Sequence, residues 1–328
     1  MTPIPVEVTP ATFFEQGAVG PGLEPGRLWR GFRRNMLDSQ LAYKKGENPM
    51  NRLLFRMSCG FAMLLLVLGL QADPAVSGAL DAFKGLEGTI QIAGGTAHIP
   101  VMNDAAKAIM TANPKIRILV EGGGSGIGVQ KVGEGLVDIG NTGRALSEQE
   151  VAKYGLKSFP FALDGVAVVV HPSNPVSSLT AQQVRDIFAG VITRWKDVGG
   201  NDAPIHLFTR DEASGTREVF WEKALKKGSV AASANVVASN GAMKVAVSQD
   251  KDAIGYAGIG HVDASVKGIV LDGVAPTQEN AMNGSYAVTR KLYMNTKGDP
   301  KPLVKAFIDY ILSPEGIEIV KKHGYLPL

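Results

Sequence analysis

Three times in this chain a short apolar run breaks into a turn rich in Gly, Ser or Thr and then passes into a helix-like stretch. The three segments are residues 90–96, 118–126 and 205–216. Each predicts a strand followed by a helix whose first backbone N–H groups lack partners, with a hydroxyl beside them. Helix starts of this kind attract oxyanions. Three of them in one chain predict a single anion held from several sides.

The same alternation of strand-like and helix-like segments continues from about residue 85 to the end of the sequence. Fully apolar strands that alternate with helices predict an α/β fold with mainly parallel sheets flanked by helices. Leu303, Phe307 and Ile311 repeat every fourth residue, which is typical of one helix face. The expected strands are residues 89–93, 116–121, 166–170, 205–208, 253–257, 269–271 and 292–295. The expected helices are residues 101–112, 181–188, 216–226 and 302–312.

The charge distribution argues against nucleic acid as a partner. Residues 1–72 hold 8 of the 34 basic and 5 of the 31 acidic residues, so the remaining chain carries 26 of each. Proteins that bind nucleic acid neutralise many phosphates with a basic stripe. A neutral body without such a stripe predicts a different ligand.

Residues 50–72 have the composition of a secretory signal peptide. Two arginines precede the apolar run 61–70, and a small residue, Ala72, stands before a polar stretch. This order is typical of a cleaved export signal, so we expect a periplasmic protein. A short membrane anchor that stays uncleaved is the alternative. Residues 1–49, rich in Pro and Gly, are expected to be a disordered extension or a mis-assigned start.

Cysteine and histidine usage argues against a disulfide and against a bound metal. Cys59, the single cysteine, lies inside the expected signal, so the exported chain would have no thiol. The histidines are scattered and lack the paired spacing of metal ligands. They are His98, His171, His206, His261 and His323. We therefore expect neither a metal nor a cofactor.

Motifs of common enzyme sites fail in this sequence. The glycine-rich turn at residues 122–128 lacks the glycine spacing of a dinucleotide-binding loop and the Lys of a Walker loop. No nucleophile elbow is present. Asp211 and Glu212 are adjacent on a turn rather than spaced as an acid and base pair. The sequence therefore predicts a binding protein and not an enzyme.

Over about residues 88–328 the chain resembles the phosphate-binding subunit of bacterial ABC phosphate importers. The most specific shared motif is Arg-x-x-x-Ser-Gly-Thr after a strand, at residues 210–216. The other matching segments are residues 93–96, 121–126, 137–140, 186–195, 239–243 and 253–256. The resemblance implies capture of inorganic phosphate with high affinity by a monomer and its delivery to an inner-membrane ABC permease complex.

The family fold is a two-lobed, hinged periplasmic-binding-protein fold, in which each lobe is a mainly parallel sheet flanked by helices. The resemblance places lobe one at residues 73–160 and 265–328 and lobe two at residues 161–264. Phosphate would lie in the cleft between the lobes, where strands end. The residues that the resemblance assigns to the ligand are Thr96, Ala97, Ser125, Arg210, Ser214, Gly215 and Thr216.

These site residues also have structural interpretations. The hydroxyl residues among them could be plain helix caps, and Arg210 could pair with Glu212. Thr142 and Asn240 are further candidates for the site, although we expect Asn240 to be chiefly structural. His98 is expected to be a bystander.

One position departs from the best-known branch of the family. There an Asp follows two residues after the Val-Asp-x-Gly motif and accepts a proton from phosphate, whereas this chain has Gly143. Another branch carries Arg one position later, which makes Arg144 a candidate second charge on the ligand, with a surface arginine as the alternative. We therefore expect weaker rejection of sulfate, unless a backbone carbonyl or a carboxylate such as Glu212 accepts the proton.

Other functions stay open at this point. The protein could bind another tetrahedral oxyanion, such as sulfate or molybdate. It could also sense phosphate without transporting it, or it could be an enzyme such as a phosphatase.

Overall fold

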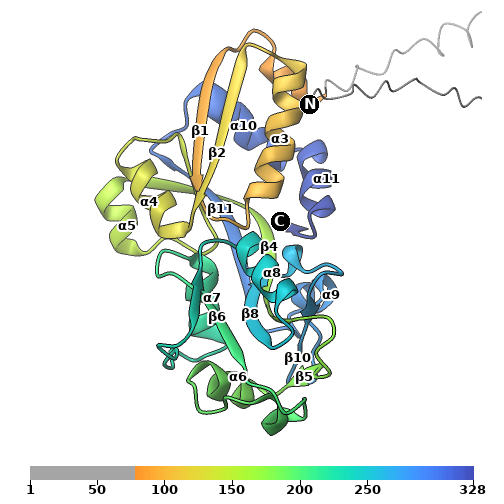
Figure 1. The fold of residues 1–328 in the computed structure, drawn as a ribbon. Coiled ribbons are helices and arrows are strands. Elements are labelled where there is room, and N and C mark those ends of the chain that lie inside the picture. Colours follow the sequence, from red (N-terminus) through yellow and green to blue (C-terminus); the bar gives the residue numbers. More distant parts are fainter. Residues whose placement is uncertain (1–77) are drawn as a thin grey trace, which may run out of the picture. The chain divides into compact units, whose positions relative to one another are not determined.

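The computed structural model describes residues 78–328, in which strands and helices alternate as the sequence predicts (Figure 1). The expected signal peptide and the residues before it lie outside the described residues. The first elements are η1 (Ala79–Phe83), β1 (Gly88–Gly94), α3 (Ile99–Ala112), β2 (Ile116–Gly123), α4 (Ser125–Gly133), β3 (Ile139–Thr142), α5 (Glu148–Tyr154) and β4 (Leu156–Val170). The middle elements are β5 (Ser178–Leu179), α6 (Ala181–Phe188), η2 (Trp195–Val198), β6 (His206–Arg210), α7 (Gly215–Lys223), β7 (Asn235–Val237), α8 (Asn240–Gln249), β8 (Ala253–Gly258), η3 (Ile259–His261), β9 (Lys267–Gly268), β10 (Val270–Leu271) and α9 (Gln278–Met282). The last elements are β11 (Thr289–Lys297), α10 (Pro302–Leu312), α11 (Pro314–Lys322) and β12 (Leu326–Pro327).

The predicted helices at residues 181–188 and 302–312 are confirmed with both ends correct. Helix α6 begins after Thr180, whose hydroxyl accepts a hydrogen bond from the Gln183 amide at 3.1 Å. This is a capping box, which satisfies two amides at the helix start. In α10, Phe307 and Ile311 are buried as the periodicity predicts. Within residues 78–328, no helix is both long and apolar enough to cross a bilayer.

The principal sheet is continuous through both halves of the described chain. Its strand order is β2-β1-β3-β11-β4-β8-β6-β7. The strands at either end pair in parallel, as predicted, but β11 is antiparallel to both β3 and β4, and β4 is antiparallel to β8. The long strands β4 and β11 therefore join two parallel groups of strands.

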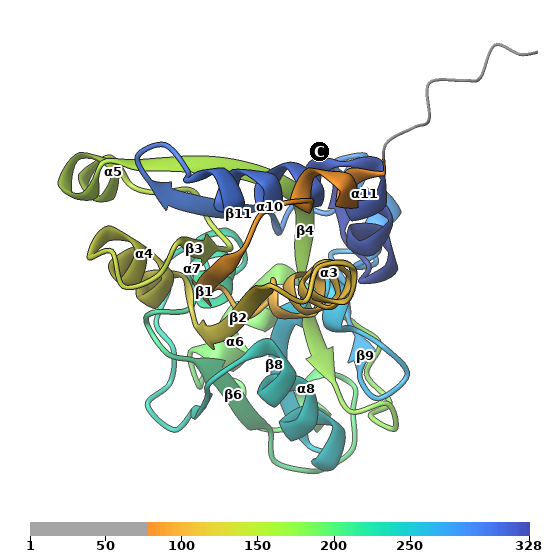
Figure 2. The ribbon, with the colours of Figure 1, turned by 90° about the horizontal axis from the view of Figure 1, so that it is seen from above.

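Two separate hydrophobic cores divide the structure into two lobes. The first core contains residues of β1, α3, α10 and α11, and α11 lies beside α3 (Figures 1 and 2). The second contains residues of α6, α7, α8 and β8. Strand β4 contributes Phe161 to the first core and Val166 to the second. The lobes are thus connected by a strand that belongs to both cores.

The cores divide the chain at positions other than those the sequence indicates. Residues 265–288 were expected in lobe one, yet Val266, Ile269, Tyr286 and Val288 pack in the second core. They do so because β9 pairs with the distal half of β4 and carries this segment along the second lobe. The chain returns to the first core only within β11, where Leu292 and Met294 are buried.

Candidate functional site

A small cavity lies where the first turns of α3, α4 and α7 meet. Both lobes contribute to it, and Arg290 reaches it from β11. The residues that line it are Gly95, Thr96, Ala97, His98, Gly124, Ser125, Gly143, Arg210, Ser214, Gly215, Thr216 and Arg290. The three turns that the sequence singles out therefore converge on one place.

The helix starts supply backbone donors to this cavity. Ser125 is the first residue of α4, and Gly215 and Thr216 are the first two of α7. Amides in the first turn of a helix have no acceptor in their own helix, and the positive end of the helix dipole lies there. The lobes approach each other closely at this point, since a Cβ on Gly215 would lie 2.1 Å from Ser125 Oγ. Only glycine fits there.

Arg210 is buried at the end of β6, and one nitrogen of its guanidinium has no hydrogen-bond partner among the described residues. Nε donates to the Val237 carbonyl at 2.9 Å and Nη2 to the Ala238 carbonyl at 3.0 Å. Nη1 is buried without a hydrogen-bond partner among the described residues. Burial lowers the pKa of Arg210. The pairing with Glu212 that the sequence left open does not form, because the Glu212 side chain is 93% exposed and lies near Arg217 instead.

Two threonine hydroxyls from opposite lobes are bridged by Asn240. Its Nδ2 donates to Thr96 Oγ1 at 3.1 Å and to Thr216 Oγ1 at 3.3 Å, and its backbone N–H also reaches Thr96 Oγ1. Arg290 Nη1 donates to Thr216 Oγ1 at 2.7 Å. Both hydroxyl oxygens thus accept two hydrogen bonds, which leaves their own protons for the cavity.

The two serine hydroxyls are held in a similar way. Ser125 Oγ accepts from the Gly143 amide at 3.0 Å, and Ser214 Oγ accepts from the Arg217 amide at 3.2 Å as the N-cap of α7. Ser214 is therefore a helix cap, as one interpretation of the sequence has it, and it also lines the cavity. All four hydroxyls are oriented by protein donors, so the cavity offers chiefly donors to its contents.

Arg290 is a site residue that sequence reasoning missed. Its Nε and Nη2 donate to Oδ2 of the buried Asp164 at 3.0 and 2.7 Å. Burial raises the pKa of Asp164, and the charge of Arg290 opposes this rise. The pair fixes the guanidinium in a cavity that already contains Arg210. Nothing in the sequence around residue 290 marks this arginine as different from one at the end of any strand.

The space next to Gly143 explains its departure from the Asp-bearing branch. A Cβ on Gly143 would lie 2.7 Å from Arg290 Nη1 and 3.2 Å from Arg290 Cζ. A carboxylate side chain therefore has no room at position 143 while Arg290 is in place. A donor, Arg290 Nη1, therefore lies where a side chain at position 143 would begin.

The structure brings most of the expected site residues to the cavity. Those that line it are Thr96, Ala97, Ser125, Arg210, Ser214, Gly215 and Thr216. Asn240 lies behind them and orients Thr96 and Thr216, which agrees with the expected structural role. The Thr142 hydroxyl is turned away, because it donates to the Arg144 carbonyl at 2.8 Å and accepts from Asn295.

Arg144 does not line the cavity, which corrects its assignment as a second charge there. Its Nη1 and Nη2 donate to the two carboxylate oxygens of Glu150 at 2.8 and 2.7 Å. Its Nε lies 2.6 Å from Glu218 Oε2, on α7. These carboxylates raise the pKa of Arg144, and the hydrogen bonds from Arg144 lower the pKa of Glu150. The guanidinium is drawn to the carboxylates and away from the cavity.

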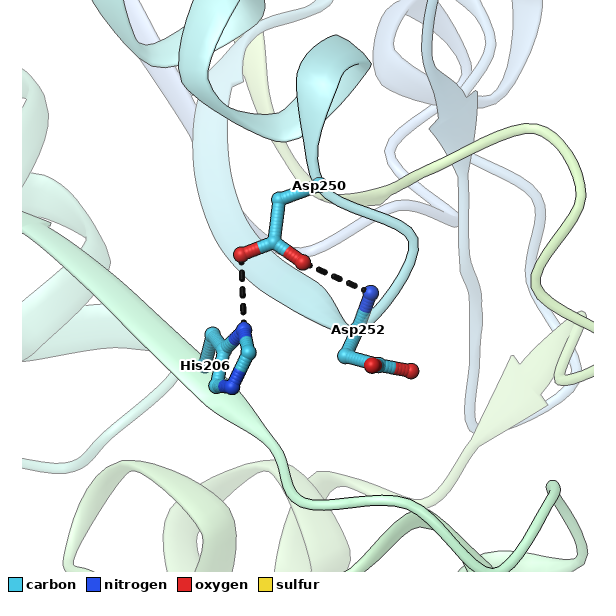
Figure 3. A group of neighbouring side chains, drawn as sticks. All are labelled: His206, Asp250 and Asp252. Carbon is cyan, nitrogen blue, oxygen red and sulfur yellow. Dashed lines mark hydrogen bonds and ion pairs between the residues drawn. The ribbon is translucent and has the colours of Figure 1, made fainter.

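A group of potential cation ligands lies elsewhere in lobe two, although the sequence indicates no metal site. His206, Asp250 and Asp252 hold ligand atoms within 4.8 Å of one another (Figure 3). His206 Nδ1 is 2.7 Å from Asp250 Oδ2, and the Asp252 amide donates to Asp250 Oδ1. Both oxygens of Asp250 are thus engaged in fastening β6 to the turn before β8. This arrangement accounts for the group without an ion.

Comparison with known proteins agrees with this geometry. The sequence model of the PBP superfamily domain matches residues 82–315. The phosphate-binding protein PstS of Bacillus subtilis is 33% identical over 283 residues, which are 84% of this chain and 93% of that protein. A phosphate ABC transporter substrate-binding protein from Clostridium perfringens, solved with bound phosphate, has a TM-score of 0.70 and 37% identity, and the match covers 74% of this chain and 100% of that one. An ABC-type phosphate transport receptor from Vibrio cholerae has a TM-score of 0.60 and 35% identity, with 72% and 99% covered. This chain therefore belongs to the PBP superfamily and, within it, to the family of the phosphate-binding proteins PstS.

Proposed function

We propose that this protein captures inorganic phosphate in the cavity between its lobes and delivers it to an ABC import permease. The observation that carries the proposal is the buried Nη1 of Arg210, which has no partner among the described residues. A charged donor withdrawn from water needs an acceptor. A tetrahedral oxyanion supplies one and also satisfies the amides and hydroxyls around it. The proposed role is binding without turnover.

The charge of the cavity supports an anionic ligand. Arg210 and Arg290 bring two positive charges, and Asp164 behind Arg290 brings one negative charge. Hydrogen bonds to a charged group contribute roughly 1.5–3 kcal/mol each. Micromolar affinity needs only about 8 kcal/mol in total. The donors at the cavity suffice for such affinity after the entropic cost of association.

The ligand-binding residues come from both lobes, which supports hinge closure as the mechanism. Ser125 belongs to lobe one, Ser214 and Thr216 belong to lobe two, and β4 and β11 would act as the hinge. A ligand that contacts both lobes stabilises the closed arrangement, which a permease can distinguish from the open one. We infer that a monomer carries out this cycle.

Calorimetric titration of the full chain with phosphate tests the proposal. Arg210→Ala should weaken binding by about 2–5 kcal/mol, because it leaves a buried anion short of charge. Arg117→Ala is the matched control, since Arg117 is exposed on β2 and away from the cavity. Phosphate affinity that is equal in the wild type and in Arg210→Ala would refute the site.

Export is part of the proposal and rests on the signal-like composition of residues 50–72. N-terminal sequencing of protein recovered from the periplasm should give a start near Asp73. Recovery of secreted protein that still carries residues 1–49 would contradict it.

A further inference from the structure

Hydrogen phosphate differs from sulfate by one proton, and that proton needs an acceptor when the anion is buried. The hydroxyls of Thr96 and Thr216 each accept two hydrogen bonds and are left as donors, whereas those of Ser125 and Ser214 each accept one from a backbone amide. The arginines and the first-turn amides are donors only. A site that offers chiefly donors discriminates poorly between sulfate and phosphate.

The carboxylates near the cavity are not placed to accept this proton. Neither Asp164 nor Asp211 lines the cavity; Asp164 Oδ2 is engaged by Arg290, and one oxygen of each carboxylate is buried without a hydrogen-bond partner among the described residues. Glu212 is almost fully exposed. At Gly143 the guanidinium of Arg290 excludes any side chain. No carboxylate among the described residues that line the cavity is therefore available as the acceptor.

His98 has the properties that this role requires. Among the described residues that line the cavity, it is the one side chain with a nitrogen that can accept a hydrogen bond. It is completely buried, and neither ring nitrogen has a hydrogen-bond partner in the described part of the chain. Its ring packs on Phe161, with the ring centroids 5.4 Å apart, and lies against Gly95. A buried imidazole without a hydrogen-bond partner indicates that a bound ligand supplies one.

We propose that the neutral imidazole of His98 accepts the proton of hydrogen phosphate and thereby replaces the missing carboxylate as the group that rejects sulfate. This inference rests on the proposed function and assigns its selectivity to one residue. A neutral imidazole carries one N–H and one lone pair. The carbonyls of Gly95, Thr142 and Tyr293 favour a proton on the ring, and the nitrogen that does not carry this proton is the proposed acceptor.

The surroundings keep the ring neutral across the physiological range. Burial and, to a smaller extent, the positive charge of Arg290 lower the pKa of His98 to about 3. A sulfate oxygen in the same place would face a lone pair with no proton between them. Both partners would then lose a hydrogen bond in a buried site, which disfavours sulfate.

Titrations with phosphate and sulfate at mildly alkaline pH test this inference, with the wild type and His98→Phe compared as full chains. Phenylalanine preserves the aromatic packing on Phe161 but has no acceptor. The variant should bind phosphate about tenfold or more weakly, whereas its sulfate affinity should change by less than about threefold. The ratio of the two affinities should therefore fall at least about tenfold. An unchanged ratio in His98→Phe would overturn the inference.

Two further variants separate the roles. His98→Gln restores an amide oxygen and should recover part of the selectivity. His261→Gln removes a half-buried histidine that does not line the cavity, and it should leave the ratio unchanged. If the wild type fails to bind phosphate, the proposed function is refuted. If the wild type binds phosphate and His98→Phe keeps full selectivity, only the role of His98 is refuted.

A measurement on the wild type covers the case in which His98→Phe does not fold. The nitrogen NMR signal of the unprotonated His98 ring atom should shift when phosphate is added and should stay in place with monofluorophosphate, a dianion without the proton. Equal shifts with both anions would contradict a hydrogen bond from phosphate to His98.

Discussion

Arg144 of the first lobe and Glu218 of helix α7 in the second form an ion pair, with Nε 2.6 Å from Oε2. Glu150 holds the same guanidinium through both of its oxygens, so Arg144 is already oriented before it meets Glu218. The pair joins the lobes beside the cavity without contacting it. If the lobes open as proposed, this ion pair has to separate.

Removal of the ion pair between Arg144 and Glu218 should weaken phosphate binding only slightly. Since the Glu218 side chain is 42% exposed, the pair is screened by water, and Arg144→Ala should reduce phosphate affinity by about 1 kcal/mol or less. A double-mutant cycle with Glu218→Gln measures the coupling by calorimetry. A loss in Arg144→Ala as large as that in Arg210→Ala would show that Arg144 contacts the anion after all.

Asn240 should matter more than a structural residue outside the site. It orients the hydroxyls of Thr96 and Thr216, and its Oδ1 accepts from the Gly258 amide at 3.1 Å. Asn240→Ala should therefore weaken phosphate binding by about 1–3 kcal/mol, because both hydroxyls lose their orientation. Asn235→Ala, on the exposed strand β7, is the control. Equal phosphate affinities of the two variants in calorimetry would show that Asn240 does not orient the hydroxyls for binding.

His98 should make the folded protein sensitive to acid. The folded state keeps the ring neutral to about pH 3, whereas the unfolded chain protonates it near the usual pKa of about 6.5. This contribution to stability is therefore complete above the unfolded pKa and is lost as the pH falls toward the folded one. Between neutral pH and about pH 4, His98→Phe should lose roughly 3 kcal/mol less stability than the wild type.

Urea unfolding at the two pH values without phosphate measures this difference. His171→Gln, at a half-buried histidine outside the cavity, is the control and should follow the wild type. Parallel losses in His98→Phe and the wild type would mean that the ring is accessible to protons in the folded state.

The sequence predicted the parts of the site that depend on local patterns. A glycine-rich turn with a hydroxyl before a helix can be recognised from the sequence alone. The turns around Thr96, Ser125 and Ser214 meet at one cavity. Their contact with phosphate remains a prediction. Arg290 was not predictable because its role depends on Gly143 and Asp164, which are remote in sequence and adjacent only in the folded sheet.

The errors have physical causes of the same kind. Arg144 follows a family motif, but Glu150 and Glu218 engage its charge, and no pattern near residue 144 shows the approach of α7. The expected strand at residues 166–170 is only the distal part of β4, because the proximal part contains exposed polar residues and Pro160. The burial of residues 265–288 in lobe two depends on pairing with that same strand.

A crystal structure of the full chain grown with phosphate tests the central claim most directly. We expect a tetrahedral anion within hydrogen-bond distance of Arg210 Nη1, the amides at the start of α7 and the Ser125 hydroxyl, so that both lobes contact it. Saturating phosphate bound elsewhere, or an anion held by one lobe alone, would contradict the account.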